Sequence, residues 1–522
     1  MYYHVRPTIS EGDAGGMDNA MKACNDTEIT SFEQYKKIAD TIQGPAYIPI
    51  TMEIPMPLAD PATIYATMAE SQGFLLESIE GIPKRAVRSI IGINPVAVLA
   101  FSDALKITGD LSDFFQTIEK KLIKNKSALE ILKQVCNSIT GHIPDNFSFS
   151  GGMAGYCKYD LVNEITQGMV QAGIEGGPVF RFIVPGDLII FDHIRNSCTL
   201  VAGTFVNPKD NFQNFYENAV LRLKKLKAIT GIEPVRFEYP KMPENITLLP
   251  GFDRDEYEGS VCQALEYIRA GDIFQVVLSR RFTLDYPGDP FRIYQVLRSI
   301  NPSPYLYYIN FGDEAIIGSS PEMLVKTEGS DITTVPIAGT RPRGKTIKED
   351  EELAQELLDD PKECAEHLML VDLARNDIGR VSEFGTVRVS EFMTVEKFSH
   401  VQHITSVVNG DMQKGLHPVD ALKACFPAGT VSGAPKIRAM QIIEELEPVS
   451  RGLYSGAVGY LSFDNRMEFA IAIRTIIVKD GVATCQAGAG IVADSVPSRE
   501  FDETQAKVSA MAQAVFCAGG QA

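Results

Sequence analysis

Two pairs of glutamates lie three residues apart in segments whose apolar spacing predicts helices. The first pair is Glu363 and Glu366, and the second is Glu500 and Glu503 near the carboxyl end. Residues three apart share a helix face, so each pair presents neighbouring carboxylates. Two such pairs brought together suit Mg²⁺, an oxygen-liganded ion that uses few protein carboxylates. Each pair alone is more simply explained as a solvated helix surface, because acidic helix faces are common.

An arginine in a predicted strand could bind a carboxylate. Alternation in the strand predicted over 467–478 places Glu468, Ala470, Ala472 and Arg474 on one face. The small alanines leave open volume beside the guanidinium, which binds carboxylates through two parallel hydrogen bonds. Alternatively, Arg474 reaches solvent from the polar face of the strand.

Two other side chains could move protons. His403 lies in a strand-like run and titrates near neutral pH, so it could act as a base. Glu322 ends a predicted strand at a turn and could act as a general acid. The alternatives are a core histidine whose hydrogen bonds are satisfied, and a glutamate that caps the turn.

Glycine-rich segments at strand ends would let a ligand approach the backbone closely. They cover residues 336–344, 426–436 and 486–491, and the second precedes a predicted helix whose amino end could seat an anion. Neither a dinucleotide fingerprint nor a P-loop occurs in them. Taken singly, each segment is more simply a tight turn.

The elements that must position these groups predict an α+β protein. Many short apolar runs bounded by glycine and proline predict strands, and helices are predicted over 111–140, 349–378 and 499–516, among others. This pattern favours large, mostly antiparallel sheets in a sandwich-like core with flanking helices. The predicted organisation is a polar extension over 1–30, an amino-terminal region over 31–230, a proline-rich linker over 231–251 and a second region over 252–515.

Composition argues against several classes of function. The chain of 522 residues is long enough for about two to four domains, and its net charge of −18 opposes binding to nucleic acid or anionic membranes. No apolar run is long enough for a membrane span, and no signal peptide is recognisable. The nine cysteines are scattered without a CxxC pair, which favours reduced thiols in a cytoplasmic protein over zinc or disulfides.

Several motifs together occur in the order found in one enzyme family. The chain resembles the chorismate-utilising enzymes, and specifically the large subunit (component I) of anthranilate synthase. The resemblance is strong over about 250–515 and weaker over about 30–205. The motifs that carry it are Gly271–Arg280, Asn301–Tyr305, Ser320–Glu322, Pro336–Arg343, Glu366–Asp377, Phe426–Lys436 and the helix with Glu503 and Lys507.

The resemblance implies roles for individual residues. Mg²⁺ would be held by Glu366 and Glu503, with Glu363 and Glu500 nearby. Catalysis would use Glu322 as the acid and His403 as the base, at a site that includes Gln275 and Thr430. The residues implied in binding chorismate are Gly339, Thr340, Tyr454, Arg474, Gly488, Ala489, Gly490 and Lys507.

Two positions distinguish among members of this family. Isochorismate- and salicylate-forming members carry a lysine that activates water where this chain has Gln275. Aminodeoxychorismate synthases typically carry a nucleophilic lysine where this chain has Ala338. Because neither glutamine nor alanine can do this chemistry, both positions favour ammonia as the nucleophile and anthranilate as the product.

The amino-terminal region is expected to be regulatory. Leu75–Ser78 resembles the family's tryptophan feedback motif, although these residues alone could be an ordinary strand. Leu306 occupies a position where relatives often have methionine. The residues implied in binding tryptophan are Glu77, Ser78, Arg88, Pro304, Tyr305, Leu306 and Tyr460.

The resulting hypothesis is an anthranilate synthase large subunit. It would convert chorismate and ammonia to anthranilate and pyruvate, the first step of tryptophan biosynthesis, under feedback inhibition by tryptophan. A separate glutamine amidotransferase small subunit (component II) would supply the ammonia, so a hetero-oligomer is expected. The alternatives are an aminodeoxychorismate synthase component I and a noncatalytic regulator that binds chorismate or tryptophan.

Overall fold

The computed structural model describes residues 29–68, 72–78, 88–123, 126–144, 149–173, 176–235, 249–250, 253–398 and 401–519. Most of the predicted extension over 1–30 therefore lies outside the described residues. Of the predicted linker over 231–251, only residues 231–235 and 249–250 are described.

Strands from both halves of the chain form one hydrogen-bonded network of 22 strands in the described part. The amino-terminal strands are β1 (Ala46–Pro55), β2 (Gly73–Glu77), β3 (Arg88–Phe101), β4 (Leu105–Thr108), β5 (Thr140–Gly141), β6 (Gly152–Cys157), β7 (Phe180–Asp192) and β8 (Ser197–Val206). The carboxyl-terminal strands are β9 (Leu249–Pro250), β10 (Gln275–Asp285), β11 (Tyr305–Asn310), β12 (Glu314–Ser320), β13 (Met323–Glu328), β14 (Asp331–Thr334), β15 (Ile337–Pro342), β16 (Arg388–Lys397), β17 (Val401–Asp411), β18 (Gly433–Ala434), β19 (Ala457–Ser462), β20 (Met467–Ile471), β21 (Thr475–Lys479) and β22 (Val482–Ile491).

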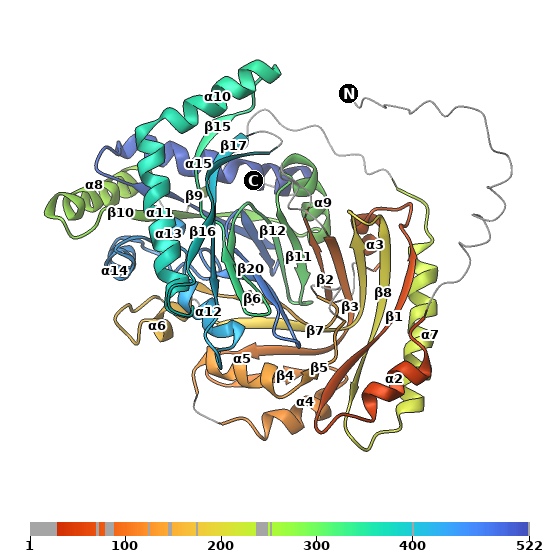
Figure 1. Cartoon of the computed structure of the whole chain (residues 1–522). Coiled ribbons are helices and arrows are strands. Elements are labelled where there is room, and N and C mark those ends of the chain that lie inside the picture. Colours follow the sequence, from red (N-terminus) through yellow and green to blue (C-terminus); the bar gives the residue numbers. More distant parts are fainter. Residues whose placement is uncertain are drawn as a thin grey trace.

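Helices flank this network, as Figure 1 shows. The first half contains α2 (Phe32–Ala39), α3 (Pro61–Ala66), α4 (Ser112–Glu119), α5 (Ala128–Asn137), the 3₁₀ turn Tyr159–Leu161, α6 (Val162–Ile165) and α7 (Phe212–Thr230). The second half contains α8 (Arg254–Ala270), α9 (Pro290–Ile300), α10 (Ile347–Asp359), α11 (Pro361–Gly379), α12 (Pro418–Cys425), α13 (Gly429–Ser432), α14 (Lys436–Leu446) and α15 (Pro497–Cys517). The predicted α+β class with a large, mostly antiparallel sheet is confirmed.

The two regions predicted from the sequence are joined by strand pairing. Strand β2 pairs antiparallel with β11, placing Glu77 opposite Leu306, and β6 pairs antiparallel with β19. Among the described strands, only β1 and β5 pair in parallel. A ligand bound where β2 meets β11 therefore contacts both regions at once.

Two long predicted helices are each broken in the structure. The helix predicted over 349–378 is divided into α10 and α11 at Asp360, whose carboxylate accepts the backbone N–H groups of Lys362 and Glu363. Pro361 follows it and starts α11, because proline lacks the N–H that a helix interior needs. The helix predicted over 111–140 is likewise two helices, α4 and α5.

The strand predicted over 467–478 is also interrupted. It ends at Ile471 as β20 and resumes at Thr475 as β21, and Arg474 between them has a φ of 49°. The expectation that Arg474 continues the face of Glu468 was therefore wrong. The pairing of β20 ends before Arg474, and the left-handed backbone at Arg474 directly precedes β21.

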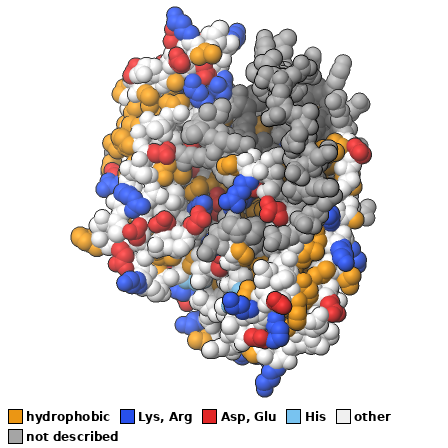
Figure 2. Space-filling view, turned by 45° about the vertical axis from the view of Figure 1, so that its right-hand side comes forward, with side chains coloured by type: hydrophobic (Ala, Val, Ile, Leu, Met, Phe, Trp, Pro, Cys, Tyr) orange, Lys and Arg blue, Asp and Glu red, His pale blue; other side chains and the backbone are white. Residues whose placement is uncertain are grey.

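Figure 2 shows acidic and basic side chains interspersed over the face that it presents. Among the described residues, no helix combines the length and apolar character needed to cross a membrane. The eight described cysteines are all free thiols.

Candidate functional site

A buried carboxyl group precedes β13. Glu322 is 7% exposed, and its backbone carbonyl accepts a hydrogen bond from Ile471 N at the end of β20. Burial raises the pKa of Glu322 to about 8, and the Thr430 hydroxyl and the Arg474 guanidinium oppose the rise. Glu322 is therefore largely protonated at neutral pH and can donate a proton.

A neutral imidazole lies on the paired strands β15 and β17. His403 Nδ1 is 2.7 Å from the carbonyl oxygen of Gly339 and 3.2 Å from Thr340 Oγ1. A carbonyl can only accept, so Nδ1 carries the proton and Nε2 keeps its lone pair. Burial lowers the pKa of His403, and Arg474 lowers it further against the effect of the Gly339 carbonyl. His403 is thus suited to act as a base.

A half-buried guanidinium links these two groups electrostatically. Burial lowers the pKa of Arg474, and the carboxyl of Glu322 opposes that shift. Arg474 influences the pKa of both Glu322 and His403, so its guanidinium interacts electrostatically with the candidate acid and with the candidate base. A cation in such a site can bind a substrate carboxylate.

The acidic face of α11 lies beside Gln275. The Gln275 amide donates a 3.2 Å hydrogen bond to Glu366 Oε1. Burial raises the pKa of Glu366, and the neighbouring carboxylates of Glu363 and Glu503 raise it further. Burial also raises the pKa of Glu500, again with a contribution from Glu503. Carboxylates from the two glutamate pairs thus influence one another electrostatically.

This group of carboxylates suits a hard divalent cation. Among the described residues, no three potential ligands are close enough to form a complete metal cage. Mg²⁺ does not require one, since it keeps several waters and takes one or two carboxylates plus substrate oxygens. Lys507 Nζ lies 2.7 Å from Glu503 Oε1 and donates to the carbonyl of Gly488, so it ties α15 to β22. A bound cation would relieve both the partial desolvation of these carboxylates and their mutual repulsion.

Glycines of β22 form a floor beneath Tyr454 and Gln275. A Cβ on Gly488 would lie 2.6 Å from Tyr454 Oη, and one on Gly490 would lie 2.7 Å from Gln275 Nε2. Side chains at these positions would displace the two polar groups. Ala489 between them is fully buried in the core packed against α8 and α14, so only its backbone can face a ligand.

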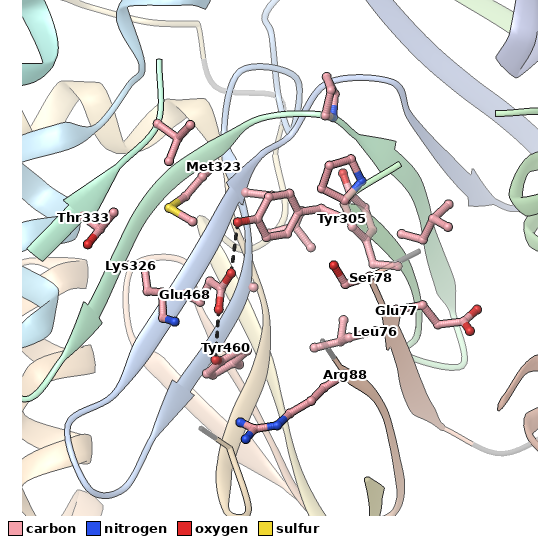
Figure 3. A pocket seen from close by; sticks show the side chains of 18 of the residues that line it. Leu76, Glu77, Ser78, Arg88, Tyr305, Met323, Lys326, Thr333, Tyr460 and Glu468 are labelled. Atoms are coloured by element: carbon pink, nitrogen blue, oxygen red, sulfur yellow. Dashed lines mark hydrogen bonds between the residues drawn. The ribbon is translucent and has the colours of Figure 1, made fainter. Parts of the chain in front are cut away.

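A cavity of about 690 Å³ lies where β2, β11, β19 and β20 meet (Figure 3). All seven residues predicted to bind the inhibitor line it, namely Glu77, Ser78, Arg88, Pro304, Tyr305, Leu306 and Tyr460. The Glu77 carboxylate, however, points away from the cavity in Figure 3. Arg298 donates to both of its oxygens, at 2.7 and 3.1 Å, and Tyr294 donates to one of them.

A carboxylate that does face this cavity belongs to Glu468, to which the sequence assigned no role. It accepts hydrogen bonds from the hydroxyls of Tyr305, at 3.0 Å, and Tyr460, at 3.2 Å (Figure 3). The neighbouring Lys326 also lines the cavity, and Glu468 contributes to raising its pKa although burial opposes this. The alternation of side chains along β20 could have indicated this position of Glu468, since Ala470 on the same face of the strand also lines the cavity.

Comparison with known proteins identifies the family of the chain. The sequence family described as chorismate binding enzyme matches residues 76–513. The chain belongs to the chorismate-binding enzymes. Among these enzymes, the anthranilate synthase component 1 of Acetivibrio thermocellus is 44% identical over 90% of this chain and 96% of its own length.

Two solved structures share the fold. Anthranilate synthase component I from Streptococcus pneumoniae TIGR4 matches with a TM-score of 0.70 and 39% identity, over 82% of this chain and 92% of that one. The menaquinone-specific isochorismate synthase of Escherichia coli matches with a TM-score of 0.65 and 19% identity, over 93% and 99% of the two chains. The predicted resemblance to anthranilate synthase component I is confirmed.

Proposed function

We propose that this chain is the large subunit of an anthranilate synthase, which converts chorismate and ammonia to anthranilate and pyruvate. The observation that carries the proposal is that the chain buries both a carboxyl group suited to donate a proton, Glu322, and an imidazole suited to accept one, His403, and that Arg474 interacts electrostatically with each. A protein that only bound chorismate would have no use for both. The high identity to proteins named anthranilate synthase component 1 supports the choice of reaction.

The proposed reaction uses each of these groups once. Ammonia adds to the chorismate ring while Glu322 protonates the departing C4 hydroxyl. His403 then removes the proton at the aminated carbon, and pyruvate leaves as the ring becomes aromatic. Arg474 and Tyr454 hold the enolpyruvyl carboxylate. Gln275 has no basic group to activate water, whereas ammonia already carries its own lone pair.

We propose Mg²⁺ as the cofactor of this site. Glu366 and Glu503 would hold it, with Glu363 and Glu500 nearby, and when bound it would neutralise the ring carboxylate of chorismate. Replacing Glu366 with glutamine is expected to raise the Mg²⁺ concentration for half-maximal rate by at least about tenfold. Isothermal calorimetry with Mg²⁺ should show the same weakening of binding without any turnover.

Asp502 is a matched control for this metal prediction. It lies beside Glu503 on α15, but it is exposed and pairs with Arg254. Asp502→Asn should leave Mg²⁺ affinity unchanged, and equal weakening in both variants would show that only the overall charge of α15 matters.

Product identification tests the function directly. The purified chain, given chorismate, Mg²⁺ and ammonium, is expected to form fluorescent anthranilate, and to form none when ammonium is omitted. A product that retains the enolpyruvyl group would instead indicate aminodeoxychorismate synthase. Binding of chorismate without any product would indicate a noncatalytic regulator.

We further propose that the chain works in the cytoplasm with a separate glutamine amidotransferase subunit that supplies ammonia. The name component 1, carried by its relatives, supports a partner. The free thiols of the eight described cysteines suit a reducing compartment.

We propose the cavity of about 690 Å³ as a tryptophan site that gives feedback inhibition through the amino-terminal region. Ser78 directly follows β2 and lines the cavity, so Ser78→Phe would fill space that an indole ring needs. The tryptophan concentration for half inhibition is expected to rise by at least about tenfold, which corresponds to about 1.4 kcal/mol of binding free energy. Ser390 is an exposed residue outside the cavity, so Ser390→Phe is the control. Unchanged inhibition of Ser78→Phe would disprove the placement.

A further inference from the structure

A buried arginine that no expectation singled out lies behind the candidate active site. Arg451 follows α14, and its side chain and that of Glu447 are only 1% and 4% exposed. The two form a bidentate ion pair, with Nε 2.9 Å from Glu447 Oε2 and Nη2 2.7 Å from Oε1. Burying two charges is costly unless every remaining donor and acceptor is satisfied.

Each of the five N–H donors of Arg451 has an acceptor. Besides the two bonds to Glu447, the guanidinium donates to the carbonyl of Val431 at 2.6 Å, the carbonyl of Val277 at 2.7 Å and the hydroxyl of Ser455 at 3.1 Å. Only the planar guanidinium fork reaches acceptors in this arrangement, and a lysine has three donors at one point.

The three acceptors outside the ion pair belong to segments that carry candidate site residues. Val431 follows Thr430, Val277 lies two residues after Gln275, and Ser455 follows Tyr454. The guanidinium carbon also lies 5.4 Å from the ring centroid of Tyr454 and 5.1 Å from that of Tyr159 on another element. One side chain therefore fixes three separate walls of the pocket relative to one another.

Glu447 extends the network to the glycine floor. It accepts from Ser279 N at 2.7 Å and from Ser279 Oγ at 2.8 Å. Ser279 Oγ in turn accepts from Gln486 Nε2 at 2.8 Å, two residues before Gly488. The pair thus connects β10 and β22 as well as α13, which contains Val431.

We infer that Arg451 and Glu447 form a positioning pair that holds the Tyr454 hydroxyl over Gly488 and aligns the Thr430 segment with Gln275. The inference rests on the proposed function, because it concerns how the enolpyruvyl carboxylate of chorismate is held. Neither side chain needs to touch the substrate. A displacement of about 1 Å in a substrate-holding group can cost about 100-fold in rate.

The test is Arg451→Lys, which keeps the charge but loses the fork. It is expected to lower kcat/KM for chorismate by about 100-fold, mainly through a higher KM for chorismate, with the KM for ammonium unchanged. If Arg451 acts through Tyr454, the loss in Arg451→Lys/Tyr454→Phe should be smaller than the product of the two single losses. Glu447→Gln, which keeps one acceptor oxygen, should show the same pattern.

Arg222 provides a matched control. Its guanidinium also donates to a buried carboxylate, that of Asp187 at 2.8 Å, and to two backbone carbonyls, those of Gly186 and Gly203, but it lies on α7. Arg222→Lys should lower the melting temperature and leave kcat/KM unchanged.

Several outcomes would overturn the positioning pair. One is a lower melting temperature in Arg451→Lys with an unchanged KM for chorismate, as in the control. Another is a double variant, Arg451→Lys/Tyr454→Phe, whose loss in kcat/KM equals the product of the two single losses. If neither Arg451→Lys nor Glu447→Gln folded, the inference would also be overturned, because the pair would then serve folding alone. Failure of the wild-type chain to make anthranilate would instead remove the proposed function.

Discussion

Replacing Glu322 with glutamine is expected to lower kcat/KM for anthranilate formation by about 10²- to 10⁴-fold, the usual contribution of a general acid. Glutamine keeps the size of the side chain and can donate a hydrogen bond, but it cannot transfer a proton. Since Glu322 is buried and its backbone is tied to the end of β20, the substitution should leave the fold intact. The rate is measured by anthranilate fluorescence, with folding checked by circular dichroism.

The pH profile should identify Glu322 as the acid. Burial raises its pKa to about 8, so the active, protonated form predominates below that pH and is lost as pH rises through it. The wild-type kcat/KM should therefore fall above pH about 8, and Glu322→Gln should lack this fall. Thr430→Val removes a hydroxyl that lowers the pKa of Glu322, so it should move the fall to higher pH. A Glu322→Gln enzyme with normal activity and an unchanged profile would exclude this role.

Local spacing predicted the parts of the site that lie within single elements. Glu363 and Glu366 share a face of α11, as their spacing required, and glycines stand where Tyr454 and Gln275 approach β22. Such features depend on helix and strand periods that the sequence displays directly. The resemblance to a family added the order of the motifs and hence their common substrate.

Long-range contacts decided the features that spacing could not predict. Glu77 was expected to bind the inhibitor, yet its carboxylate is engaged by Arg298, which is 221 residues away. Arg474 was expected to continue a strand, but the chain leaves the pairing before it. The hydrogen bond from Arg451 to Val277 spans 174 residues. Contacts between residues so far apart leave no periodic pattern in a single sequence, so they could not be predicted from it.

Replacing His403 with alanine is expected to stop the second half of the proposed reaction, with an overall loss of about 10²- to 10⁴-fold. The base is needed only after ammonia has added, so the aminated ring that still carries the enolpyruvyl group should accumulate. Mass spectrometry of the reaction mixture distinguishes this compound from anthranilate by the retained enolpyruvyl group. Added imidazole should restore part of the anthranilate rate, because it can occupy the vacated space and accept the proton.

The pH dependence should separate His403 from Glu322. Burial lowers the pKa of His403, so the neutral, active form persists below the usual pKa of histidine and is lost only as pH falls through the lowered value. His417 is a control, because it is also buried but caps α12 away from the pocket, and asparagine is a favourable residue at a helix start. His417→Asn should retain full activity. If His403→Ala formed anthranilate at the wild-type rate, the Gly339 carbonyl would be orienting a purely structural imidazole, and the base would have to be sought elsewhere in the pocket.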